Sequence, residues 1–154
     1  MSLPSGPLVA WLADDFTGGS AVAETLAFAG LPAALLLDPP DAAALAGLTH
    51  LRGVGLATTA RTEGPAWMEE RLPGLFAALI ATGAPLVHYK ACSTMDSAPT
   101  LGSLGQALER GLAATGAAVA PILFAAPAMG RFQAFGHLFA AADGGIHRID
   151  RHPV

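Results

Sequence analysis

Short apolar runs alternate with segments of helical spacing along most of the chain. Brief runs of mostly apolar residues, bounded by turn-forming residues, are typical of buried strands. The pattern predicts strands at Leu8–Leu12, Ala33–Leu37, Gly53–Ala57, Leu86–Tyr89 and Ile122–Ala125. Alternation of strands with helices favours a mostly parallel sheet with helices on both faces. We therefore expect an α/β fold, a three-layer α/β/α arrangement with a Rossmann-like sheet of about five to six strands.

The segments between these runs carry helix signals. Thr17–Ala29 places apolar residues on one face and is followed by Gly30, a typical helix stop. Asp41 is a suitable N-cap for a short helix that ends at Gly47. A longer helix is predicted over Pro65–Ala81, with a kink or a break into two short helices at Pro73-Gly74.

Two further elements complete the predicted fold. Leucines at helical spacing form the apolar face of a helix, at Leu101, Leu104, Leu108 and Leu112. Near the end of the chain, Asp143-Gly144-Gly145 lies between two short runs, which predicts a hairpin from His137 to Ile149. No internal repeat and no linker interrupts the pattern, so we expect one domain over residues 1–154.

Composition narrows the class of protein. Hydrophobic residues make up 53% and charged residues 13%, which excludes a disordered chain and predicts a large core. The net charge of −4, without a basic cluster, argues against a nucleic-acid partner. No signal-peptide pattern begins the chain, and no run reaches the roughly 18 apolar residues that span a bilayer, so we expect no membrane partner. Cys92 is the only cysteine, which fits a cytoplasmic location.

Polar residues gather where the predicted strands end. Asp14, Asp15 and Thr17 follow the first strand and open a helix, whose start offers free N–H groups to an anion. Carboxyl ends of parallel strands meet at one edge of a sheet, where ligands bind. The other strand ends contribute Thr58, Thr59, Arg61, Lys90, Ser93, Thr94, Asp96, Gly130 and Arg131. This mixed-charge rim suits a small hydroxylated anion.

Several of these residues also have a purely structural interpretation. Neighbouring residues on a strand point in opposite directions, so one of Asp14 and Asp15 can cap the helix, as can Thr17. Arg61 can clamp a carboxylate with its planar fork or be a solvated charge. Lys90 ends an apolar strand, so it can bind a ligand or form a structural ion pair with Asp14, Asp15 or Asp96.

The remaining candidates have the same two interpretations. Ser93 and Thr94 can bind substrate hydroxyls or satisfy the backbone of their own loop. Arg131 can contact an anion or lie at the surface, and His137 can act on a ligand or make a structural hydrogen bond. No histidine has metal-ligand spacing to a cysteine or carboxylate, so we expect no metal site. Phosphate loops, dinucleotide fingerprints and nucleophile elbows are also missing from the sequence.

Five stretches together carry a family resemblance. Ala13–Gly18 resembles the A-D-D-[FL]-T-G signature of the four-carbon acid sugar kinases, and Tyr89–Thr94 resembles their Y-K-x-[CD]-S-T segment. Ala126–Arg131 and Gly136–Phe139 resemble the A-P-A-x-x-G-R…G-H/N-L-[FY] segment, and Thr58 to Arg61 matches loosely at the third strand end. The resemblance spans nearly the whole chain, and the ordered set of motifs is specific.

The resemblance implies an ATP-dependent kinase that phosphorylates tetronates or 3-oxo-tetronates on the terminal hydroxyl. It implies that this chain is the N-terminal sugar-acid-binding domain, inactive alone, and that a separate C-terminal domain binds ATP and Mg²⁺. Members of the family tend to pair, which favours a homodimer. Met95-Asp96-Ser97 stands where many members carry a basic T-L-R-G-N stretch, which predicts altered specificity.

Under this hypothesis two carboxylates orient the substrate hydroxyls, and one of them accepts the proton of the attacking hydroxyl. Basic side chains and the helix start neutralise the substrate carboxylate. The candidate catalytic residues are Asp14 and Asp15, and the candidate substrate-binding residues are Thr17, Gly18, Arg61, Lys90, Ser93, Thr94, Gly130, Arg131 and His137. The alternatives are a non-catalytic module that binds small organic acids and a Mg²⁺-dependent phosphate-handling hydrolase.

Overall fold

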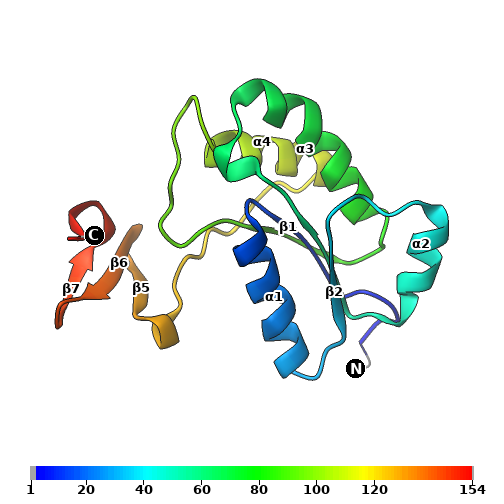
Figure 1. The fold of residues 1–154 in the computed structure, drawn as a ribbon, viewed down its shortest axis with the longest axis horizontal. Helices are drawn as coiled ribbons and strands as arrows, with labels where there is room; N and C mark the ends of the chain where they lie inside the picture. Colours follow the sequence, from blue (N-terminus) through cyan, green and yellow to red (C-terminus); the bar gives the residue numbers. More distant parts are fainter. Residues whose placement is uncertain (1–2, 154) are drawn as a thin grey trace. The chain divides into compact units, whose positions relative to one another are not determined.

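Four parallel strands form the main sheet of the computed structural model, which describes residues 3–153 (Figure 1). The strands lie in the order β2-β3-β1-β4. Their bounds are β1 Val9–Ala13, β2 Ala33–Leu36, β3 Gly53–Ala57 and β4 Leu86–Lys90. The first four predicted strands are therefore confirmed, in a sheet with fewer strands than the five to six expected. This sheet belongs to the first of two compact units, which runs to Cys92 and resumes over Asp96–Val119.

The helices of this unit begin where the sequence places capping residues. They are α1 Phe16–Phe28, α2 Ala42–Gly47, α3 Pro65–Ile80 and α4 Leu104–Thr115. Asp15, Asp41 and Ser103 each accept a hydrogen bond from a main-chain N–H in the first turn of α1, α2 and α4, respectively. The part of the chain that the structure describes contains no helix long and apolar enough to cross a membrane.

Side chains of β1 alternate between two different packing environments. Ala10 and Leu12 lie in the core cluster with the buried face of α3, whereas the Trp11 indole donates a hydrogen bond to the Gly19 carbonyl of α1 at 3.3 Å. The indole also covers β3, because a Cβ added to Gly55 would lie 2.0 Å from its Cε2. Strand alternation thus assigns α1 and α3 to opposite faces of the sheet.

Helix α3 runs as one helix through Pro73, so of the two predicted alternatives, a kink or a break into two short helices, the break does not occur. Proline removes one N–H donor from a helix and strains the preceding turn. The neighbouring positions Leu72, Leu75 and Phe76 are buried in the core, so packing on the sheet holds the helix together across the proline. On its outer side, α4 packs closely enough that a Cβ on Gly111 would lie 3.1 Å from Cζ of Phe76.

The predicted fifth strand, Ile122–Ala125, is not a strand. A strand needs a neighbouring backbone, and this segment instead bonds to one side chain of its own unit. The Gln133 amide accepts from the Phe124 N–H at 3.0 Å and donates to the Ile122 carbonyl at 3.2 Å. Consequently Arg131 does not follow a parallel strand, as the sequence had suggested, but begins a small antiparallel sheet.

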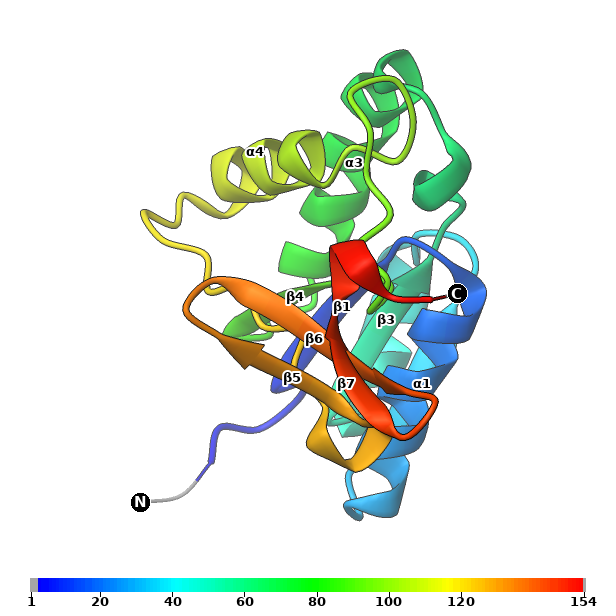
Figure 2. The same ribbon diagram turned by 90° about the vertical axis from the view of Figure 1, so that its left-hand side faces the viewer.

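This antiparallel sheet forms the second unit, which comprises Ser93–Met95 and the residues from Ala120 onward. Figure 2 shows its strands, β5 Arg131–Ala134, β6 His137–Ala142 and β7 Gly145–Arg148. The predicted hairpin is confirmed, with Asp143 and Gly144 as a two-residue loop in which both φ angles are positive. A second loop of the same kind, Phe135-Gly136, joins β5 to β6.

The strand order creates a switch point beside β1. The chain crosses from β1 past β3 to reach β2, and it later crosses from β3 past β1 to reach β4. The connecting helices α1 and α3 cover opposite faces, so the switch point lies between the loops that follow β1 and β3. It is at the carboxyl ends of the strands, where Asp14 follows β1 and Thr58 follows β3.

Candidate functional site

The main chain of Asp14 ties three strand ends together. Its N–H donates to the Lys90 carbonyl at the end of β4, at 3.0 Å. Its carbonyl accepts from the Arg61 N–H, beyond the end of β3, also at 3.0 Å. Thr58 adds a third link, because its hydroxyl donates to the Ala13 carbonyl at 2.7 Å. Thr58 is therefore a structural residue, and Asp14 has a fixed position at the switch point.

The Asp14 carboxylate is buried, with 3% of the residue exposed. Its Oδ2 accepts a hydrogen bond from the main-chain N–H of Cys92 at 3.3 Å. Its Oδ1 is buried and has no hydrogen-bond partner within the described residues. Burial raises the pKa of this carboxyl above its usual value, although the Cys92 N–H opposes the shift. One oxygen of Asp14 is thus available to a ligand or a proton.

Asp15 has a different environment, because it is the N-cap of α1. Its Oδ1 accepts from the Gly18 N–H at 2.5 Å, and its Oδ2 accepts from Nη1 of Arg61 at 3.3 Å. Both oxygens of Asp15 are therefore bonded within the site. Thr17 is exposed in the first turn of the helix and is not its cap. The capping interpretation is confirmed for Asp15 and not for Asp14 or Thr17.

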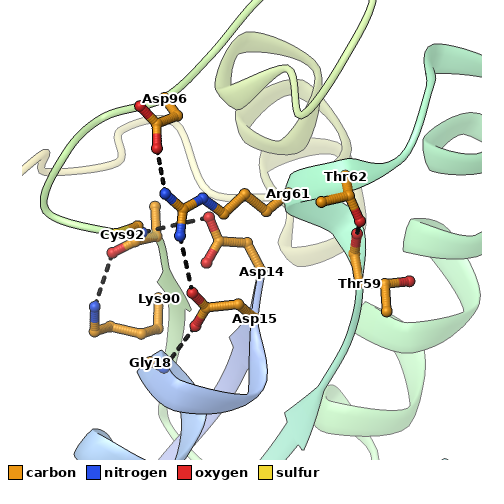
Figure 3. A network of polar contacts seen from close by, with 10 residues as sticks. Asp14, Asp15, Gly18, Thr59, Arg61, Thr62, Lys90, Cys92 and Asp96 are labelled. Carbon is orange, nitrogen blue, oxygen red and sulfur yellow. Dashed lines mark hydrogen bonds and ion pairs between the residues drawn. The ribbon is translucent and has the colours of Figure 1, made fainter.

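Arg61 lies between two carboxylates, those of Asp15 and Asp96 (Figure 3). Its side chain is 30% exposed, whereas that of Asp96 is 59% exposed. The hydrogen bond to Asp96 is the main cause of a raised pKa for the Arg61 guanidinium. The alternative of a solvated surface charge therefore does not describe Arg61, which is an ion-paired member of the cluster.

Lys90 lies beside the start of α1. Its Nζ donates to the Ala91 carbonyl at 2.8 Å, and a Cβ added to Gly18 would lie 3.6 Å from the same Nζ. In the described part of the chain no ion pair joins Lys90 to a carboxylate, so the structural ion pair suggested by the sequence is not formed. Lys90 is half-buried, and its ammonium group lies next to a helix N-terminus. The charge of the ammonium group and the partial positive charge of the helix N-terminus both favour an anion.

Five of the candidate residues lie in the second unit: Ser93, Thr94, Gly130, Arg131 and His137. Ser93 is half-buried and Thr94 is exposed. Gly130 has a φ of +66°, and a Cβ there would lie 3.0 Å from Cβ of Ala141. The backbone conformation and the close packing within the second unit therefore explain why a glycine occupies this position. Arg131 is half-buried, and its Nε is buried without a hydrogen-bond partner among the described residues. His137 is exposed at the start of β6.

Two contacts of the cluster are not evident from sequence motifs. The main-chain N–H of Cys92 has no residue-specific signal, because any residue but proline could supply it. Asp96 stands out in the sequence only as a polar residue after the fourth strand. It forms an ion pair with Arg61, and whether it pairs with Arg61 or with Lys90 depends on the path of the loop. The side chain of Cys92 itself is half-buried.

A pocket of about 260 Å³ lies at the carboxyl ends of β2 and β3, and its lining residues are not those of the cluster. It combines apolar side chains with a cation, a carboxylate and hydroxyl groups. Its lining includes Phe16, Leu37, Asp38, Thr59, Trp67 and Arg71. Within residues 3–153 no group of three or more histidine, cysteine, aspartate or glutamate side chains could hold a metal ion. Within this site the groups that favour an anion are Arg61, Lys90 and the start of α1.

Comparison with known proteins identifies a family and relatives of this chain. Residues 9–154 match the model of a family described as a sugar-binding N-terminal domain. The chain is 43% identical over 151 residues to a 3-oxo-isoapionate kinase of Paraburkholderia graminis, covering 98% of this chain and 32% of that protein. It is 32% identical over 133 residues to a 3-oxo-tetronate kinase of Pseudomonas fluorescens, covering 86% of this chain and 30% of that protein. It thus spans about a third of the length of these curated relatives.

Proposed function

Because the chain belongs to the family of sugar-binding N-terminal domains, we propose that it is the substrate-binding domain of an ATP-dependent sugar-acid kinase. The substrates proposed are four-carbon acid sugars, the tetronates and 3-oxo-tetronates, phosphorylated on the terminal hydroxyl. The names of two relatives, a 3-oxo-isoapionate kinase and a 3-oxo-tetronate kinase, support this class of reaction. The proposal includes a cytoplasmic enzyme with a Rossmann-like α/β/α substrate domain that forms a homodimer.

The observation that carries the proposal is the environment of Asp14. A buried carboxylate, one of whose oxygens has no hydrogen-bond partner among residues 3–153, lies in the same cluster as the side chains of Arg61 and Lys90. An unpaired buried carboxylate is costly unless a ligand or proton satisfies it. A hydroxylated acid can satisfy the carboxylate and the cations of this cluster. Its hydroxyls can donate hydrogen bonds to the Asp14 carboxylate, and its own carboxylate can pair with Arg61 or Lys90.

The residues differ in the roles that we propose for them. Asp14 accepts a hydrogen bond from the terminal hydroxyl and takes its proton when that oxygen attacks phosphorus. A carboxyl with a raised pKa is a better proton acceptor than an ordinary one. Asp15 maintains the start of α1 and orients Arg61. Arg61, Lys90 and the first turn of α1, with Thr17 and Gly18, neutralise the substrate carboxylate.

ATP supplies the phosphoryl group, and ADP is the leaving group. The described residues include no cluster that fits Mg²⁺, so no step is assigned to a metal ion held by this chain. We propose that the nucleotide and its Mg²⁺ bind to a C-terminal domain like the part that the relatives have beyond this match. The chain alone is then expected to bind sugar acid without transferring phosphate. Ser93, Thr94, Gly130, Arg131 and His137 remain proposed substrate-binding residues.

Thermal unfolding of the chain with a ligand panel tests the proposal. The panel comprises erythronates, threonates and their 3-oxo forms, each with and without MgATP. A ligand that binds only the folded state at a hundredfold excess over its Kd stabilises it by about 2.7 kcal/mol. Asp14→Asn tests the carrying observation, and Asp41→Asn is the matched control, because asparagine caps a helix as well as aspartate does.

The expected result is a higher unfolding midpoint with one or more sugar acids and no change with MgATP. Asp14→Asn should reduce the sugar-acid shift, whereas Asp41→Asn should leave it unchanged. A shift with MgATP alone would move the nucleotide site onto this chain and contradict the proposal. An unchanged shift in Asp14→Asn would refute the role of Asp14 while leaving sugar-acid binding intact.

A further inference from the structure

The two carboxylates that flank Arg61 are held in different ways. Asp15 caps α1 through Gly18, so its position is tied to the start of a helix. Asp96 is 59% exposed and lies in the stretch between β4 and α4, outside any helix or strand. If an incoming ligand takes a place on the guanidinium, moving Asp15 would uncap a helix, whereas moving Asp96 would not. Asp96 is therefore the partner that can be exchanged.

The loop that carries Asp96 is anchored beside the cluster at both ends. Near its start, the Cys92 N–H donates to Asp14 at 3.3 Å. Near its end, the Gly102 N–H donates to the Glu63 carbonyl at 2.9 Å. Gly102 also approaches the backbone of Arg61 so closely that a Cβ would lie 2.4 Å from the Arg61 carbonyl oxygen. These anchors keep Asp96 within reach of Arg61 (Figure 3).

Charge balance favours exchange over addition. The cluster contains three carboxylates, those of Asp14, Asp15 and Asp96, and two cations, Arg61 and Lys90. A ligand carboxylate that joined this cluster would add a further negative charge at short range, which is unfavourable. A ligand carboxylate that replaced Asp96 on Arg61 would leave the charge beside the guanidinium unchanged, because both partners present the same group.

We propose that Asp96 is an internal substitute for the substrate carboxylate: it pairs with Arg61 in the ligand-free protein, and the carboxylate of the sugar acid displaces it. This inference rests on the proposed function, because it needs an acidic ligand at the cluster. Asp96 then determines specificity by competition. It lowers the affinity of the site for acids and has no such effect on neutral polyols with the same hydroxyl groups.

Titration calorimetry on the whole chain tests this competition. The probes are erythronate and threonate, and the neutral controls are erythritol and threitol, which lack the carboxylate. The variants are Asp96→Asn and, as a matched removal of charge, Glu24→Gln, an exposed residue of α1 about 12 Å from the first residue of that helix. Breaking an exposed ion pair has a small effect, so Asp96→Asn should lower the Kd for the acids about two- to fivefold. The Kd for the polyols, and all Kd values of Glu24→Gln, should stay unchanged.

A double-mutant cycle separates competition from a general change in the loop. If Asp96 acts through Arg61, the gain from Asp96→Asn must disappear when Arg61→Gln is already present. A loop that merely became more flexible would change acid and polyol binding alike, in either background. The unfolding midpoint of each variant, measured without ligand, identifies any loss of folding.

Four outcomes contradict the inference. Weaker acid binding by Asp96→Asn would mean that Asp96 contacts the ligand directly, and equal binding would mean that it does not compete; both leave the proposed function standing. A gain that persists in the Arg61→Gln background would assign the effect to something other than that pair. Failure of both the wild-type chain and Asp96→Asn to bind any sugar acid would overturn the proposed function and this inference together.

Discussion

The Asp14 carboxylate accepts a hydrogen bond from the Cys92 N–H through Oδ2 and buries Oδ1 without a partner in the described part of the chain. A single main-chain donor does not replace the water that a carboxylate loses on burial. The pKa of Asp14 is accordingly raised above 3.8. The site therefore contains a carboxylate whose ionised form is unfavourable for folding, which is common where function requires a reactive group.

The first prediction concerns the stability of Asp14→Asn. A carboxyl whose folded pKa is raised stabilises the folded state below its unfolded pKa and loses that contribution as pH rises through the folded pKa. At pH 7 the wild-type chain has lost it, so Asp14→Asn should be more stable there by on the order of 1 kcal/mol. The difference should shrink as pH falls toward 4, which denaturant unfolding between pH 4 and 8 would measure. A variant less stable than wild type at pH 7 would contradict the raised pKa.

The second prediction concerns the contact between Gly18 and Asp15. A Cβ on Gly18 would lie 2.7 Å from Oδ1 of Asp15 and 3.5 Å from Cγ of Lys90. Gly18→Ala should therefore displace the Asp15 cap, which is worth about 0.5–2 kcal/mol, and offset the roughly 0.5–1 kcal/mol that alanine gains in a helix. Stability should change little, while binding of erythronate or threonate should weaken at least tenfold because the cap and the cation move.

Gly74→Ala is the matched control for Gly18→Ala. Gly74 also lies within a helix, but a Cβ there would meet nothing within 4 Å. This variant should gain about 0.5–1 kcal/mol in stability and bind sugar acid as the wild-type chain does. Calorimetric titration and denaturant unfolding of both variants provide the comparison. Equal affinity for sugar acid in the two variants would exclude a role for the start of α1 in binding.

Local signals explain why so much of the first unit could be predicted from the sequence. Strands β1 to β3 consist of apolar residues and glycine, β4 begins with two apolar residues, and Asp15 and Asp41 are capping residues at the starts of helices. The prediction at Ile122–Ala125 was wrong because an apolar run specifies a strand only when a neighbouring backbone is available. In this structure the side chain of Gln133 takes that place.

For the candidate site, the sequence predicts which residues lie at one edge of the sheet but not which contacts they make. Parallel strands bring their carboxyl ends together, so Asp14, Arg61 and Lys90 could be expected at one edge from the pattern alone. Which of Asp14 and Asp15 caps the helix, and which is buried at the site, could not be predicted, because this depends on where the helix begins relative to the strand. The pairing of Asp96 with Arg61 depends on a loop path, for which the sequence contains no periodic signal.

The third prediction concerns the packing of Trp11 on Gly55. A Cβ added to Gly55 would lie 2.0–2.4 Å from three atoms of the indole, which is itself fully buried. The added methyl group would be attached to the backbone of β3 and would overlap the buried indole ring, and neither can move easily. Gly55→Ala should therefore destabilise the chain by about 1–3 kcal/mol. Gly47→Ala is the control, since a Cβ at Gly47 meets nothing within 4 Å and its φ of −72° suits alanine.

Denaturant unfolding of both variants, monitored by tryptophan fluorescence, would test this packing. Gly55→Ala should shift the unfolding midpoint to lower denaturant, and Gly47→Ala should leave it unchanged or raise it slightly. A Gly55→Ala variant as stable as the wild-type chain would mean that the indole does not lie on β3. Binding of sugar acid by Gly47→Ala should be unaffected.

The last prediction concerns the turn between β5 and β6. Phe135 has a φ of +51° and Gly136 a φ of +76°, so the two-residue loop has the positive angles of a type I′ turn. The left-handed conformation costs an ordinary residue about 1–2 kcal/mol, but asparagine tolerates it, and the fully exposed Phe135 ring loses no burial when it is replaced. Phe135→Asn should therefore stabilise this hairpin by about 1 kcal/mol, slowing amide hydrogen exchange in β5 and β6.

Asp143→Asn is the control, because it changes the other hairpin loop from Asp-Gly to the equally suitable Asn-Gly, so it should leave exchange nearly unchanged. Faster exchange in Phe135→Asn would mean that the phenyl ring stabilises the turn through contacts that outweigh its backbone strain.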